Sequence, residues 1–117
     1  MADSPLITKS KEFALQIIKV CNYVKQNKKE NVLTNQLIRS GTSVGANIRE
    51  AFYGHGTADF IAKLQIALKE CSESEYWLEL LNRTGYIPDD RYKMLQNDFG
   101  SVRRMLISSI NTVKSKQ

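Results

Sequence analysis

The stretch RSGTSVGANIREA, at residues 39–51, contains the residue types in this chain that are best suited to chemistry. A glycine-rich segment can cradle phosphate, but a phosphate loop needs Gly-x-x-x-x-Gly-Lys-Ser/Thr, so that backbone amides and a lysine converge on the anion. Gly41 and Gly45 lack that lysine, and no predicted strand precedes them, as a dinucleotide-binding fingerprint would require. We therefore expect no nucleotide loop here.

The same two glycines fit the interior of a helix. Residues four apart lie on one helix face, so Gly41 and Gly45 would let a partner backbone approach more closely than any side chain permits. Each glycine costs about 1 kcal/mol relative to alanine in a helix interior. The sequence therefore predicts close helix packing at these two positions.

A polar row occupies another face of the same predicted helix, at Arg39, Ser43, Asn47 and Glu50. Serine and asparagine are poor fillers of an exposed helix face, but they hydrogen-bond well at a buried polar contact. We interpret the row as a structural polar network within or between chains. A solvated surface and a ligand site are the alternatives.

Little else in the sequence suggests catalysis. His55 is the single histidine, and it has no nearby cysteine or matched carboxylate that would indicate a triad or a zinc site. A di-iron bundle would need Glu-x-x-His repeats, and Ser43 has no base within helical reach. Cys21 and Cys71 lie on apolar helical positions, which favours buried free thiols. We expect no enzymatic activity, no metal and no cofactor.

Apolar residues recur at spacings of three and four in four segments, which predicts four helices and no strand. The first helix is expected to begin with Ser4 as N-cap and Pro5 at its first position, and to end in the polar run 25–31. The second contains the glycine motif. The expected core positions of these two helices are Leu6, Ser10, Phe13, Ile17, Val20 and Val24, then Leu33, Leu37, Gly41, Val44, Ile48 and Ala51.

The other two helices follow the Gly54-His55-Gly56 break. Thr57 is expected to cap the third, which ends at residues 85–88, and Asp89 or Asp90 the fourth. Their expected core positions are Phe60, Leu64, Ala67, Cys71, Ser74, Leu78 and Leu81, then Tyr92, Leu95, Phe99, Val102, Leu106, Ser109 and Val113.

Short connections between long helices favour antiparallel neighbours, so the expected fold is all-α: an antiparallel up-down-up-down four-helix bundle, one domain over residues 1–117. The apolar fraction of 42% and the presence of only two prolines argue against disorder. No apolar run approaches the roughly 18 residues that span a bilayer, and residues 1–6 lack the features of a signal peptide. We expect a cytoplasmic protein with no membrane partner.

The motif residues resemble those of a known family. Arg39, Ser43-Val44, Asn47-Ile48 and Glu50-Ala51 match the signature of the bacterial ribosomal-RNA intervening-sequence proteins, a family that includes the accessory variability determinant of diversity-generating retroelements. Further matches are residues 66–70, residues 75–78 and the helix-ending Gly85-Tyr86-Ile87. The resemblance implies a barrel-like homo-oligomer, typically a pentamer, with no known catalysis. For the retroelement branch, it implies a basic scaffold that holds a reverse transcriptase and nucleic acid.

Charge is unevenly distributed along the chain. The formal net charge is +5, but the predicted third helix is acidic and the other segments are basic. In a ring, this acidic surface could face a basic surface of the next protomer and leave positive charge on the exposed faces. Five copies would carry about +25, enough for a long-range field that attracts polyanions.

These charges give two hypotheses for function. The first is a non-enzymatic basic scaffold that binds RNA or DNA; the second is a structural or protein-binding bundle whose charge only aids solubility. Tyr53 and His55 could offer a stacking surface, although aromatic residues at a bundle end often just cover the core. The candidate phosphate contacts are Lys25, Lys28, Lys29, Arg103, Arg104, Lys114 and Lys116.

Overall fold

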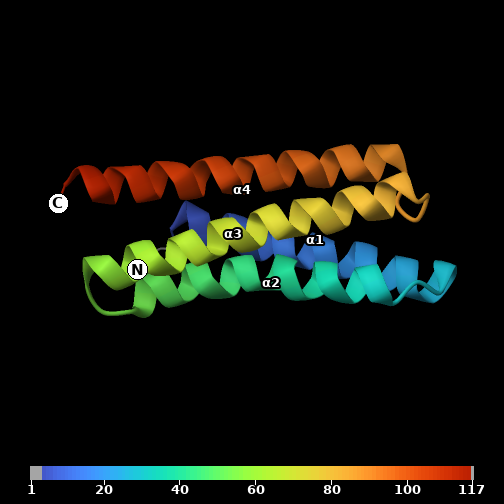
Figure 1. The fold of residues 1–117 in the computed structure, drawn as a ribbon, viewed down its shortest axis with the longest axis horizontal. Coiled ribbons are helices and arrows are strands. Elements are labelled where there is room, and N and C mark those ends of the chain that lie inside the picture. The colour runs from blue at the N-terminus through green and yellow to red at the C-terminus, as the bar shows by residue number, and fades with distance from the viewer. Residues whose placement is uncertain (1–3, 117) are drawn as a thin grey trace.

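The computed structural model describes residues 4–116, and within them it contains four helices and no strand (Figure 1). The helices are α1 (Pro5–Lys28), α2 (Val32–Tyr53), α3 (Gly56–Arg83) and α4 (Asp89–Ser115). Each helix packs antiparallel to the next, and α4 returns beside α1 to close the bundle. The predicted all-α four-helix fold is confirmed. The molecule is elongated, with extents of 48 × 23 × 19 Å.

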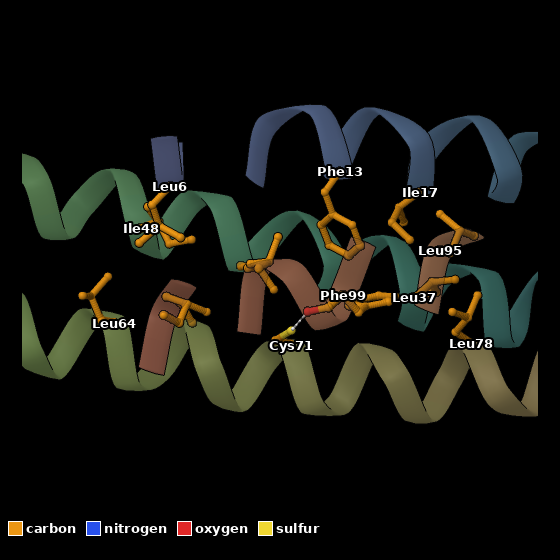
Figure 2. Packing of buried hydrophobic residues seen from close by; sticks show 14 of the residues in the cluster. Leu6, Phe13, Ile17, Leu37, Ile48, Leu64, Cys71, Leu78, Leu95 and Phe99 are labelled. Carbon is orange, nitrogen blue, oxygen red and sulfur yellow. Dashed lines mark hydrogen bonds between the residues drawn. The ribbon is translucent and has the colours of Figure 1, made fainter. Parts of the chain in front are cut away.

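A single apolar core runs between the helices, and Figure 2 shows its middle section. The rings of Phe13 in α1 and Phe99 in α4 meet edge to face, with centroids 4.2 Å apart. Six predicted core positions are only partly buried: Val20, Leu33, Phe60, Tyr92, Ser109 and Val113. Next to Val20 and Phe60, Cys21 and Ile61 take the inner positions, because the side chains of a straight helix drift from a strict heptad.

The first helix begins as predicted. The Ser4 hydroxyl oxygen accepts a hydrogen bond of 3.2 Å from the Ile7 amide, and Pro5 occupies the first helical position. The predicted polar break at 25–31 is shorter than expected, since α1 continues to Lys28. Only residues 29–31 separate α1 from α2.

The two caps predicted for α3 and α4 are wrong. Thr57 lies inside α3, which begins at Gly56, because Gly56 has a φ of 82° that lets the chain turn directly into the helix. Asp89 and Asp90 lie inside the first turn of α4, with Pro88 at the N-cap position. The Asp89 carboxylate instead accepts a hydrogen bond of 2.9 Å from the Asn82 side-chain amide, at the end of α3.

The turn between α3 and α4 is held by backbone hydrogen bonds. The Tyr86 amide donates to the Leu81 carbonyl at 2.9 Å and the Gly85 amide to that of Asn82 at 3.0 Å, which is the Schellman pattern. Gly85 has a φ of 87°, the left-handed conformation that this pattern requires. The Asn82 side-chain amide also donates to the Ile87 carbonyl at 3.0 Å. This turn is therefore fixed in place.

Candidate nucleic-acid interface

The polar motif of α2 divides into separate contacts and does not form one network. The Arg39 guanidinium forms ion pairs with Glu70, at 3.4 Å, and with Glu73 on α3. Glu73 also accepts a hydrogen bond of 2.9 Å from the Trp77 indole. Arg39 thus joins α2 to α3 while remaining about half exposed.

The remaining motif residues are bonded locally or at the other end of the same seam. The Asn47 side-chain amide donates to the Ser43 carbonyl at 2.9 Å and lies 3.0 Å from the Ser43 hydroxyl, both within α2. Glu50 forms an ion pair of 3.7 Å with Lys63 on α3. The motif therefore acts mainly along the α2–α3 seam.

The two motif glycines lie against α1. A Cβ atom added at Gly41 would lie 3.1 Å from Ile17 Cγ2, which is tighter than ordinary contact. One added at Gly45 would meet the Ser10 hydroxyl at 3.4 Å, which is ordinary contact. The close approach is therefore tighter at Gly41 than at Gly45, and its partner is Ile17.

A buried hydroxyl pair between α2 and α3 was missed by the sequence reasoning. The Ser74 hydroxyl lies 2.7 Å from the Ser40 hydroxyl, and both side chains are fully buried. Ser40 in turn donates to the Gln36 carbonyl at 3.0 Å. The signal that could have indicated it is helical spacing, since Ser40 lies three residues after the predicted core residue Leu37 and four before Val44.

The basic candidates do not gather on one face of the protomer. Lys25, Lys28 and Lys29 lie at the end of the bundle where α1 meets α2, together with Arg91 in the first turn of α4 (Figure 1). We call these four residues the basic end. Lys114 and Lys116 lie at the opposite end, since α4 is 27 residues long, or about 40 Å.

The two arginines in the middle of α4 differ from each other. Arg103 forms an ion pair with Glu75 on α3, so part of its charge is already neutralised. Arg104 is exposed and forms no ion pair with any residue between 4 and 116. Arg104 lines a shallow hollow together with Phe52 and Met105.

The acidic charge of α3 is largely neutralised within the protomer. Glu70 and Glu73 pair with Arg39, Glu75 pairs with Arg103, and Glu79 pairs with Arg83 at 3.2 Å. By contrast, no ion pair within residues 4–116 involves Lys25, Lys28, Lys29 or Arg91. The four charges of the basic end are therefore free of ion pairs, as are those of Lys9, Lys11 and Lys69 elsewhere.

Hydrogen bonds hold in place the short segment between α1 and α2, next to which the lysines of the basic end lie. The Glu30 carboxylate accepts hydrogen bonds of 3.1, 2.8 and 3.0 Å from the amides of Val32, Leu33 and Thr34, and so caps α2. Partial burial acts to raise the pKa of Glu30, but these hydrogen bonds outweigh it and hold the pKa below its usual range. The Lys25 ammonium donates to the Asn35 side chain across the same connection.

A groove beside the basic end has a volume of about 500 Å³. One wall is a face of α1 with Lys19, Tyr23 and Lys28, and the other is the α3–α4 turn with Tyr86, followed by Arg91. Of these, only Lys28 was a candidate from the sequence. The groove joins residues more than 50 positions apart, so no local pattern could have indicated it.

The other sequence candidates take up different surroundings. Tyr53 is 74% exposed and lies with His55 at the end opposite to the basic end. Cys21 and Cys71 are free and buried, and burial raises the pKa of each thiol to about 12. Within residues 4–116, no group of three or more His, Cys, Asp or Glu side chains could hold a metal ion. None of the helices in that range is both long and apolar enough to cross a membrane.

Comparison with known proteins identifies the family. No curated protein matches the chain. A solved structure from Bacteroides thetaiotaomicron, described as a protein of unknown function from the S23 ribosomal protein family, is 50% identical and superposes with a TM-score of 0.88. The match covers 90% of this chain and 97% of that one. The family model described as 23S rRNA-intervening sequence protein matches residues 3–108, and the chain therefore belongs to that family.

Proposed function

We propose that this protein is a non-enzymatic scaffold that binds nucleic acid through its basic end. The observation that carries the proposal is the contrast between the two kinds of charge. The four glutamates of α3 are held in ion pairs, whereas Lys25, Lys28, Lys29 and Arg91 form none within the described chain. Unpaired lysines and arginines attract phosphate and release its counterions.

Family membership supports the proposal, because the family is described by its relation to 23S ribosomal RNA. Lys114, Lys116 and Arg104 remain candidate contacts on the opposite half of the bundle. A homo-oligomer, a pentamer by resemblance, would repeat these charges and extend the field. A reverse transcriptase is the protein partner we propose if the chain serves a retroelement.

The test is fluorescence anisotropy with a structured RNA and a duplex DNA at two salt concentrations, with light scattering on the same samples. The expected result is micromolar or tighter binding that weakens steeply with salt. Replacing Lys25, Lys28 and Lys29 by glutamine should lower the slope of log K against log salt by up to about 3.

A matched control separates a specific surface from overall charge. The variant with Lys9, Lys11 and Lys69 replaced by glutamine loses the same charge outside the candidate set, and none of these lysines forms an ion pair within residues 4–116. It should retain most of the affinity. Equal losses in both variants, or no binding by the wild type at low salt, would refute the proposal.

The second candidate function is a structural or protein-binding bundle. The exposed face of α3 favours it, because Ile66 and Tyr76 are 43% and 53% exposed and both lie on the outer half of the helix, about 80° apart around its axis. If the wild type forms a stable oligomer but binds no nucleic acid, this second function becomes the better account.

A further inference from the structure

We propose that the groove beside the basic end binds an unpaired nucleotide of a single strand, with the base on Tyr23 and the phosphate between Lys28 and Arg91. This inference rests on the proposed function and specifies it. It assigns the groove a preference for single strands, which the basic charge alone does not supply.

The groove has the volume and the lining of a ligand site. Its volume of about 500 Å³ lies within the range of ordinary ligand sites, which is about 300–1,000 Å³. Val24 and Ile87 close its floor and are only 1% exposed, so they belong to the packed core. The partly buried Val20 beside them is the apolar surface that a flat, partly apolar ligand would cover.

Two tyrosine side chains line the groove. Tyr23 is 56% exposed at the edge of the groove, although a tyrosine gains stability when its ring is covered. Tyr86 also lines the groove and is half-buried. Every base has a flat face that stacks on such rings, so the contact suits a single strand of any sequence.

Most charged side chains in the lining of the groove are cationic. Lys19, Lys28 and Arg91 line the same groove, and none of them forms an ion pair within the part of the chain that the structure describes. Asp90 is the one carboxylate in the lining. Three cations against one anion favour a phosphate, and Asp90 can accept a hydrogen bond from a ribose hydroxyl or a base amino group.

The wall formed by the α3–α4 turn is held in position before any ligand arrives. The Schellman hydrogen bonds and the bond from Asn82 to the Ile87 carbonyl fix the backbone next to Tyr86. A preformed site loses less conformational entropy on binding than a mobile one. The tyrosines and cations are thus presented together by rigid elements.

Binding of fluorescein-labelled U12 RNA and of a 12-base-pair RNA duplex by the full-length protein, measured by anisotropy, tests the inference. Tyr23→Ala should weaken binding of U12 by about 5- to 100-fold, as expected for the loss of one stacked base, and should leave the duplex within about twofold. The matched control is Tyr76→Ala, because Tyr76 on α3 is 53% exposed, much like Tyr23, and lies outside the groove. Its affinity for U12 should not change.

A folding check, a conservative variant and a competition experiment accompany this test. Thermal unfolding should show that Tyr23→Ala is folded, and Tyr23→Phe should restore the binding of U12, since the ring and not the hydroxyl is required. Poly-glutamate should compete with U12 only weakly. Competition by poly-glutamate as strong as by unlabelled U12 would show that the groove takes acidic peptides and overturn the inference.

Two further outcomes would distinguish this inference from the proposed function. If the wild type binds both nucleic acids and Tyr23→Ala binds U12 unchanged, the groove is not the site and the scaffold function still stands. If Tyr23→Ala weakens U12 and duplex equally, base stacking is refuted in the same way. If the wild type binds neither probe, both proposals fail together.

Discussion

Glu30 shows how a single side chain shapes the surface that we assign to nucleic acid. It lies just before α2, where helix amides have no partner within the helix, and its carboxylate accepts from three of them. The Asn31 side chain, at the N-cap position itself, makes no such bond. The cap of α2 therefore depends on Glu30.

Replacing Glu30 by alanine should lower the free energy of unfolding at pH 7 by about 1 kcal/mol, the usual effect of losing a cap. The folded-state pKa of Glu30 is lowered, so its contribution is present above the unfolded value and is lost as pH falls through the folded one. Urea unfolding at pH 7 and at pH 3 measures this. An equal loss of stability at both pH values would contradict the assigned role.

Lys29 occupies an unfavourable backbone conformation. Its φ of 57° and ψ of 27° make it the one non-glycine residue of positive φ among residues 4–116. A side chain at such a position costs about 1 kcal/mol relative to glycine. A lysine at this strained position fits a role for its charge, because strained residues cluster at functional sites.

Lys29→Gly should therefore raise the free energy of unfolding by up to about 1 kcal/mol while weakening nucleic-acid binding. Lys28→Gly is the matched control, since Lys28 is the last residue of α1 and glycine is unfavourable in a helix. The control should lower stability instead. If Lys29→Gly raises stability and does not weaken binding, its charge has no part in binding.

The two motif glycines set how closely α1 and α2 approach each other. Alanine is favoured over glycine by about 1 kcal/mol inside a helix, so the outcome of each substitution depends on the space for a methyl group. Gly45 offers ordinary contact distances, whereas Gly41 faces Ile17, which is fully buried and has little room to move.

Gly45→Ala should stabilise the protein by up to about 1 kcal/mol, and Gly41→Ala should be less stable than Gly45→Ala by at least about 1 kcal/mol. Chemical denaturation of the wild type and both variants under the same conditions measures these differences in stability. Equal stability of the two variants would show that Gly41 is not the point of closest approach between α1 and α2.

The helices were predictable from the sequence because each has its own apolar period, but the starting residues of α3 and α4 were not. Thr57 is a good N-cap in isolation, yet the positive φ of Gly56 begins α3 one residue earlier. The ion-pair partners of the charged residues were not predictable either. Glu73 and Arg39 are 34 positions apart, and only the packing of α3 on α2 shows that they neutralise each other.

The whole molecule is built around one apolar core, and its two buried thiols lie in that core on different helices. Cys21 in α1 and Cys71 in α3 are both 0% exposed, and burial raises the pKa of each from 9.0 to about 12. Between pH 9 and pH 12, the unfolded chain loses thiol protons that the folded chain keeps. Folding stability therefore falls as pH rises through this range.

Each thiol should contribute a slope that approaches about 1.4 kcal/mol per pH unit above pH 9. Lysines and tyrosines also begin to ionise there, so the comparison must be with the double variant Cys21→Ala, Cys71→Ala, which keeps those groups. Urea unfolding between pH 8 and pH 10.5 should show a shallower decline for the variant, whatever its stability at pH 8. Parallel curves for the two proteins would mean that the core admits water or relaxes to hold the thiolates, and that the bundle is less tightly closed than its packing indicates.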